Sequence, residues 1–207
     1  GKTVWEDYAR TNTYTDDEAA KKAQVIRDFA ATVRPDSVID MGCNTGDFSA
    51  AALEGSAGRV VGFDFDQNAV DLAFMRASSR SLNFLPLWLD AANPSPSQGW
   101  RQTERSGFGR RFKADALIAL AFEHHLAIGR NIPLGQVVDW LMSIAPVGLI
   151  EFVPKVDSTV QTMLALREDI FPDYTEESFT QAVERNAKII SKTVVSGSGR
   201  TLFRYQR

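Results

Sequence analysis

The stretch of sequence that decides the fold is Val38-Ile39-Asp40-Met41-Gly42-Cys43-Asn44-Thr45-Gly46. Residues 37–41 predict a short buried strand, the two glycines a turn, and residues 47–53 a helix. A strand, a glycine turn and a helix in this order form the opening unit of a parallel α/β sheet. Ligands of such sheets bind beyond the carboxyl ends of the strands, so Asp40 and the glycine turn mark the candidate site.

The rest of the chain repeats this alternation of strands and helices. Further strands are predicted over residues 59–64, 83–89, 115–121, 149–153, 188–195 and 201–205. Further helices are predicted from the capping box at Thr15 to residue 33, and over residues 66–77, 134–144, 157–170 and 175–186. Pro86 indicates an edge strand, and residues 196–200 a hairpin that makes one strand antiparallel. Residues 90–113 form a long loop with room for a short helix near residues 98–105, and such a loop is functional or mobile.

Length and composition fit one soluble domain. The chain has 207 residues, 44% hydrophobic and 24% charged, which excludes collagen, disorder and coiled coil. The net charge of −3 gives no support to nucleic-acid binding, and no apolar run reaches the ~20 residues that span a bilayer. One cysteine excludes an internal disulfide and favours a cytoplasmic location. Because the chain begins at Gly1 rather than Met, we expect the natural protein to extend further at its N-terminus.

Two carboxylates define the predicted ligand. A dinucleotide fingerprint needs three glycines, whereas this turn has two and follows Asp40, a carboxylate that would repel a pyrophosphate and attract an ammonium or sulfonium group. Asp64 ends the second strand eighteen residues after Gly46, near the spacing at which an acidic residue accepts hydrogen bonds from a ribose. Asp66 is predicted to cap the next helix, and Phe65 either contacts an adenine or packs in the core.

The residues 40–46 followed by Val60-Val61-Gly62-Phe63-Asp64 resemble the first two motifs of class I S-adenosylmethionine-dependent methyltransferases. The resemblance covers residues 15–206 and implies a Rossmann-like, seven-stranded, mostly parallel sheet in the order 3-2-1-4-5-7-6, with strand 7 antiparallel and helices on both faces. It also implies S-adenosyl-L-methionine as cofactor, with S-adenosyl-L-homocysteine as product. The implied cofactor-binding residues are Asp40, Gly42, Cys43, Asn44, Gly46, Asp64, Phe65, Asp90, Ala91, Leu120 and Ala121. Cys43 is expected to be a small buried filler of that loop and Asp90 to contact the adenine or simply to begin a polar loop.

A narrower resemblance rests on residues 85–96, 124–128 and 150–155. These stretches are similar to a bacterial group of nodulation-protein-like methyltransferases, whose members are longer at the N-terminus. The group label implies no substrate.

The residues after the fourth strand are the candidates for acceptor chemistry. The Asn/Asp-Pro-Pro-aromatic stretch of many amino methyltransferases is absent here, and Glu123-His124-His125 is the polar cluster expected near the methyl donor. His125 or His124 would take a proton from the acceptor, with Glu123 orienting one imidazole. Alternatively, the histidines pack against the cofactor and transfer needs only proximity. Two histidines are too few for a metal site, so no metal is predicted. Lys22 is interpreted as part of a solvated helix face.

Two flanking segments are candidates for binding the acceptor. Residues 1–14, ending at Tyr14, form a predicted lid or extension before the methyltransferase domain of residues 15–207. Asn93 and Trp100 lie in the long loop with four arginines, which binds an anionic acceptor or is simply solvated.

The sequence therefore predicts a bacterial cytoplasmic enzyme that transfers a methyl group to an oxygen or nitrogen atom of a small-molecule or carrier-linked acceptor. The alternatives are a catalytically idle cofactor-binding domain of a longer protein and a nucleic-acid methyltransferase, the latter unlikely given the acidic composition. Neither a membrane partner nor an oligomeric state is predicted.

Overall fold

A single mixed sheet organises the molecule. Within residues 15–165 and 167–207, the part of the chain that the computed structural model describes, the strands form one seven-stranded sheet in the order β3-β2-β1-β4-β5-β7-β6. Strands β1 to β5 are parallel, and β7 runs antiparallel to both of its neighbours. The strands are β1 (Val38–Met41), β2 (Val60–Asp64), β3 (Phe84–Trp88), β4 (Ala116–Ala119), β5 (Val147–Phe152), β6 (Lys188–Val194) and β7 (Thr201–Gln206). The predicted fold class and strand order are confirmed.

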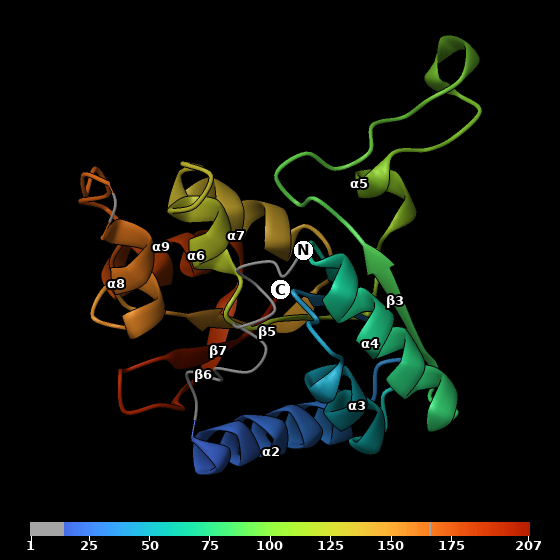
Figure 1. Ribbon diagram of the computed structural model, residues 1–207, viewed down its shortest axis with the longest axis horizontal. Helices are drawn as coiled ribbons and strands as arrows, with labels where there is room; N and C mark the ends of the chain where they lie inside the picture. The colour runs from blue at the N-terminus through green and yellow to red at the C-terminus, as the bar shows by residue number, and fades with distance from the viewer. Residues whose placement is uncertain (1–14, 166) are drawn as a thin grey trace.

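Helices cover both faces of this sheet (Figure 1). One face packs against α2 (Asp16–Val33), α3 (Asp47–Glu54) and α4 (Gln67–Ser79). The other packs against α5 (Phe108–Arg111), α6 (Glu123–Ala127), α7 (Leu134–Met142), α8 (Ser158–Leu164) and α9 (Glu176–Asn186). The central strands β1 and β4 are therefore buried on both sides, which explains why all of their residues except Asp40 are apolar. No helix among the described residues is both long enough and apolar enough to cross a bilayer.

Local sequence signals account for several of the element ends. The predicted capping box of α2 is present, with the Glu18 amide donating to Thr15 Oγ1 and the Thr15 amide donating to the Glu18 carboxylate. Asp66 caps α4 as predicted, accepting a hydrogen bond from the Asn68 amide at 2.8 Å. Pro86 lies in β3, which is an edge strand, and residues 195–200 form the predicted hairpin turn between β6 and β7.

The helix predicted over residues 157–170 is too long. Asp157 is the N-cap residue rather than the first helical residue, and α8 ends at Leu164. Tertiary contacts hold the following segment away from a helical path: Arg167 donates to the Ile128 carbonyl at 2.7 Å, and Lys155 pairs with Asp169 at 2.8 Å. The helical periodicity of the sequence was therefore overridden by contacts to distant residues.

The long loop after β3 forms an arm that projects from the body of the molecule (Figure 1). The backbone groups of Gln98 and Arg105 bond to each other across the arm at 2.8 and 3.1 Å, and a short 3₁₀ helix, Trp100–Gln102, lies at its end. Phe108 in α5 anchors the base of the arm because its ring is buried against Phe63. The loop therefore forms a hairpin whose base packs on the core.

Candidate functional site

The end of β1 carries a buried carboxylate. Asp40 is 1% exposed, and its Oδ2 accepts a hydrogen bond from Ser49 Oγ in α3 at 2.6 Å. Burial raises the pKa of Asp40 to about 7, against the weaker lowering effect of the Ser49 bond. A carboxyl group with a pKa near 7 loses its proton readily when a cationic group lies beside it. Asp40 therefore fits a ligand bearing an ammonium or sulfonium group.

The turn that follows β1 needs glycine at both of its predicted positions. Gly42 has φ +77° and Gly46 φ +82°, a region that other residues rarely adopt. A Cβ atom on Gly42 would lie 2.9 Å from the ring of Phe122, and one on Gly46 would lie 2.5 Å from the ring of Phe84. The turn thus packs tightly against Phe122, which follows β4, and Phe84, the first residue of β3, and these contacts fix its path.

The end of β2 holds the second carboxylate in a fixed orientation. The backbone amide of Asn44 donates to Asp64 Oδ2 at 2.8 Å, and the amide of Asp66 donates to Oδ1 at 2.9 Å. Burial raises the pKa of Asp64, while these amide bonds lower it in part. Each oxygen still has a free lone-pair direction, so Asp64 can accept two hydrogen bonds from a ligand. We call Asp40, Gly42, Asn44, Gly46 and Asp64 the glycine-turn cluster.

Aromatic side chains lie beside this cluster. Phe65 and Trp88 are 50% and 52% exposed, with ring centroids 5.9 Å apart, and Trp88 Nε1 donates to the Phe65 carbonyl at 2.7 Å. Arg130 lies over the Phe65 ring at 5.6 Å and pairs with Asp90 Oδ2 at 3.4 Å. Because Phe65 is half exposed, ordinary core packing does not explain it. An exposed aromatic face next to a carboxylate is suited to a flat heterocycle that carries an amino group.

A buried ion pair between Lys22 and Glu151 holds the backbone that follows β4. Leu120 is 5% exposed, and Ala121 adopts φ +47°. The Ala121 amide donates to Glu151 Oε2 of β5 at 2.7 Å, and Lys22 Nζ of α2 lies 2.8 Å from the same oxygen. Neither the Lys22 nor the Glu151 side chain is exposed. The interpretation of Lys22 as part of a solvated helix face is wrong, because its ammonium group turns inward to neutralise Glu151.

Glu123 belongs to a closed set of hydrogen bonds with Tyr174 and Val153. Its Oε1 accepts from the Val153 amide at 2.9 Å, and the Tyr174 hydroxyl lies 2.7 Å from both Glu123 Oε1 and the Val153 carbonyl. A phenol has one proton, so it satisfies both oxygens only if Glu123 itself carries a proton and donates it to Tyr174. Burial raises the pKa of Glu123 to about 7, in agreement with this geometry.

The two histidines follow directly on α6. His124 is 0% exposed, its Nδ1 lies 3.4 Å from Glu123 Oε2, and its ring is 4.1 Å from that of His125. In the described part of the chain, His124 Nε2 is buried without a hydrogen-bond partner. Burial lowers the pKa of both imidazoles to about 3, so both are neutral and only weakly basic at neutral pH. We call Lys22, Glu123, His124, Glu151 and Tyr174 the buried polar cluster.

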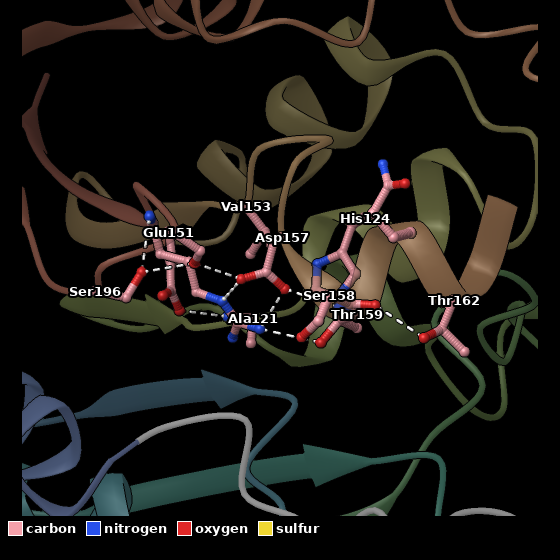
Figure 2. Close-up of polar contacts among 12 residues, drawn as sticks. Ala121, His124, Glu151, Val153, Asp157, Ser158, Thr159, Thr162 and Ser196 are labelled. Atoms are coloured by element: carbon pink, nitrogen blue, oxygen red, sulfur yellow. Dashed lines mark hydrogen bonds and ion pairs between the residues drawn. The ribbon is translucent and has the colours of Figure 1, made fainter. Parts of the chain in front are cut away.

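A second buried ion pair lies in the same region (Figure 2). Asp157 accepts two hydrogen bonds at 2.7 Å from the guanidinium of Arg200, and both side chains are 3% exposed. Ser198 donates to Asp157 and Arg200 donates to Thr159, which ties the β6–β7 hairpin to the start of α8. Burial favours a higher pKa for Asp157, but the bonds from Arg200 and Ser198 outweigh it and lower the pKa.

The remaining predicted site residues are more scattered. Cys43 is 4% exposed and burial raises its thiol pKa, which fits the predicted filler role. Ala91 is half-buried, Asn93 is exposed, and Trp100 is 78% exposed at the end of the arm. Tyr14 and the predicted lid lie outside the described residues. Among the residues described, no group of three or more His, Cys, Asp or Glu side chains is arranged to hold a metal ion.

Sequence reasoning missed Glu151, Tyr174 and Arg130 as parts of this region. Glu151 had the clearest signal, because a glutamate within the apolar strand Leu149–Phe152 must be buried and paired. Tyr174 and Arg130 lie in loops, far along the chain from the residues they contact. Nothing in the local sequence marked either of them.

No protein-family model matches the chain. It is 55% identical, over 206 residues, to nodulation protein NoeA of Rhizobium meliloti (strain 1021); the match covers 100% of this chain and 43% of that protein. The chain thus spans less than half the length of this curated relative.

The fold is that of the class I methyltransferases. Magnesium protoporphyrin IX methyltransferase from Synechocystis PCC 6803, solved with bound S-adenosylhomocysteine, superposes with a TM-score of 0.65, 18% identity, and coverage of 98% of this chain and 94% of that one. The 16S rRNA methylase RmtB superposes with a TM-score of 0.61, 16% identity, and coverage of 92% and 64%. These two neighbours, a magnesium protoporphyrin IX methyltransferase and a 16S rRNA methylase, show that the fold serves very different acceptors.

Proposed function

We propose that this protein is an S-adenosylmethionine-dependent methyltransferase acting on an oxygen or nitrogen atom of a small-molecule or carrier-linked acceptor. One observation carries the proposal: in a methyltransferase fold, the amides of Asn44 and Asp66 hold the Asp64 carboxylate beside the glycine turn and the buried Asp40. A carboxylate held in this way is preorganised for a ribose diol, and Asp40 offers a counter-charge for a cationic ligand.

The glycine-turn cluster fits the cofactor in its backbone as well as in its charges. Positive φ angles and the close approach of Phe84 and Phe122 leave no room for side chains at positions 42 and 46, and so fix the path of the turn. With glycine at both positions, the main chain itself lines the place of the methionine part, together with Cys43, Leu120 and Ala121. Bound S-adenosylmethionine would supply a methyl group made electrophilic by its sulfonium.

Phe65, Trp88 and Asp90 would hold the adenine. One exposed ring face contacts the heterocycle, and the Asp90 carboxylate, next to Ala91, accepts from the exocyclic amino group. Arg130 lies over the same ring of Phe65 and pairs with Asp90, so it must shift or stack on the adenine when that site fills. The pair with Asp90 is partly exposed and long at 3.4 Å, which makes such a shift inexpensive.

The imidazoles are the groups that act on the acceptor in this proposal. His125 is partly exposed, and neutral at physiological pH, so it can accept the proton of an acceptor hydroxyl or amine. His124 and Glu123 support it through the stacked ring pair and the Nδ1 contact. Because burial keeps the pKa of His125 low, its imidazole takes the acceptor proton only during methyl transfer and then passes it on to water.

The arm and the residues before α2 complete the acceptor side of this proposal. Asn93 is exposed where the chain leaves the end of β3, and Tyr14 directly precedes the capping box of α2. Trp100, at the end of the arm, is suited to a large acceptor, because a small one seated at the methyl group would not reach it. A small acceptor would instead meet Asn93.

A screen for methylated products tests the activity. The protein is incubated with S-adenosylmethionine carrying a ¹³C-labelled methyl group and with extracts of metabolites, carrier proteins or RNA. We expect the label in one compound of the metabolite or carrier fraction. Label found only in RNA would overturn the proposed acceptor class.

The full burial of His124 and the pKa values of about 3 for both imidazoles favour a second candidate function. These facts fit a domain that binds the cofactor without using it, within a longer protein of the kind matched. Three results together would favour this function. Calorimetry would show cofactor binding, no fraction would take up the label, and His125→Gln would change the binding of no partner.

A further inference from the structure

We infer that Glu151, held in place by Lys22, is a positioning residue that fixes the backbone at the end of β4 in the conformation the cofactor requires. This inference rests on the proposed function, because it concerns the wall of the cofactor site. Glu151 itself touches neither cofactor nor acceptor, and it acts through Ala121.

The backbone of Ala121 adopts a conformation that is unfavourable for alanine. Its φ of +47° lies in the left-handed region, which costs free energy for any residue with a side chain. An alanine stays there only if surrounding contacts hold it. The contact present is the hydrogen bond from the Ala121 amide to Glu151 Oε2, and its 2.7 Å length is typical of a bond to a charged acceptor.

The second step concerns the charge of Glu151. Glu151 is 0% exposed, and burying a charged group costs free energy unless it is paired. Lys22 Nζ lies 2.8 Å from the same oxygen, is equally buried and forms an ion pair with Glu151. The ammonium group therefore reaches from α2 through the core to strengthen the acceptor of the Ala121 amide.

The third step is where Ala121 leads. The next residue, Phe122, packs on Gly42 so closely that a Cβ there would be 2.9 Å from its ring. Glu123 and His124 then begin α6. The left-handed residue thus sets the direction in which the chain passes the glycine turn and delivers the candidate acceptor residues. The hydrogen bond from Ala121 to Glu151 therefore links the glycine turn and the start of α6 to β5.

The test compares two double variants that both remove the buried ion pair. Lys22→Met/Glu151→Gln leaves an amide oxygen for Ala121 to bond, whereas Lys22→Met/Glu151→Leu leaves none. We expect the Gln variant to bind S-adenosylhomocysteine within about 3-fold of wild type. The Leu variant should bind about 10-fold more weakly, since the competent conformation becomes a minor one.

The other buried ion pair supplies the matched control. Asp157→Leu/Arg200→Met removes two charges that are nearly as buried, and Ser198 and Thr159, which bond to this pair, lie outside the proposed cofactor site. It should lower the melting temperature and leave affinity for S-adenosylhomocysteine unchanged. If affinity falls equally in this control and in the Leu variant, or in neither, Glu151 has no positioning role.

A second readout needs no cofactor. In ¹⁵N-labelled protein, amide exchange of Ala121 should be slow in wild type and the Gln variant and faster in the Leu variant, with β5 amides unchanged. Equal exchange at Ala121 in all three proteins would overturn the inference. If wild type binds neither S-adenosylmethionine nor its product, the proposed function fails, and the exchange result alone decides whether Glu151 holds Ala121.

Discussion

The glycine-turn cluster and the buried polar cluster lie at neighbouring strand ends but are built in opposite ways. The first comes from one short stretch and one residue of β2, and main-chain amides hold its Asp64 carboxylate. The second joins residues from α2, α6, β5 and the segment before α9, and its side chains hold one another by an ion pair and by hydrogen bonds. Binding is expected to depend on local geometry in the first cluster, and folding on long-range pairing in the second.

The largest effect should follow from changing the histidine at the border of the buried polar cluster. His125→Gln should lower turnover about 10²- to 10⁴-fold, the range for loss of a general base, with cofactor affinity nearly unchanged. Glu123→Gln should lower turnover less. The measurement is steady-state kinetics with the acceptor found in the screen. If turnover and cofactor affinity fall together, His125 is only a wall of the pocket.

Next in size is the loss of a buried charge within the buried polar cluster. Lys22→Met leaves the Glu151 carboxylate unpaired at 0% exposure and should lower the free energy of unfolding by about 3–5 kcal/mol. Lys155→Met, which breaks the exposed pair with Asp169, is the control and should cost less than about 1 kcal/mol. Urea unfolding gives both values. Equal losses would mean that burial does not distinguish these two pairs.

The glycine-turn cluster should show the reverse pattern. Asp64→Ala should weaken cofactor binding by about 1.5–3 kcal/mol, the worth of hydrogen bonds to a charged group. Its effect on unfolding should be smaller than that of Lys22→Met, because only amide bonds at the protein surface are lost. Binding of S-adenosylhomocysteine and urea unfolding are measured on the same preparations. Unchanged affinity would move the ribose contact elsewhere, for example to Asp66.

The smallest effect is the change of the free energy of unfolding with pH, and residues of both clusters contribute to it. Asp40 and Glu123 have folded-state pKa values raised to about 7, so the folded protein binds more protons than the unfolded chain between about pH 4 and 7. Each of these carboxyls lowers stability as pH rises through that range, by at most about 1.4 kcal/mol per pH unit. His124 and His125, whose pKa values are lowered to about 3, act in the opposite direction up to about pH 6.5, so the net slope is small. Urea unfolding at pH 5 and pH 8 measures the difference. Glu123→Gln should shift this difference toward higher relative stability at pH 8, because it removes one of the two groups that favour low pH. An identical difference in wild type and variant would contradict the assigned protonation.

The two clusters also differ in how far the sequence predicted them. The glycine turn, the Asp64 end of β2 and the cap at Asp66 depend on residues close together in the chain, where spacing carries the information. The sheet order followed from the resemblance and the strand pattern. The ion pair of Lys22 with Glu151 joins residues that tertiary structure alone brings together, so helix periodicity assigned Lys22 to the wrong face.

The central claim is that the glycine-turn cluster binds S-adenosylmethionine, and calorimetry on the wild-type protein tests it most directly. S-adenosylmethionine and S-adenosylhomocysteine should each bind one to one. NAD, with its pyrophosphate, should not bind, because the turn lacks the third glycine and Asp40 lies at its start. Binding of NAD with no binding of either S-adenosyl compound would contradict the account.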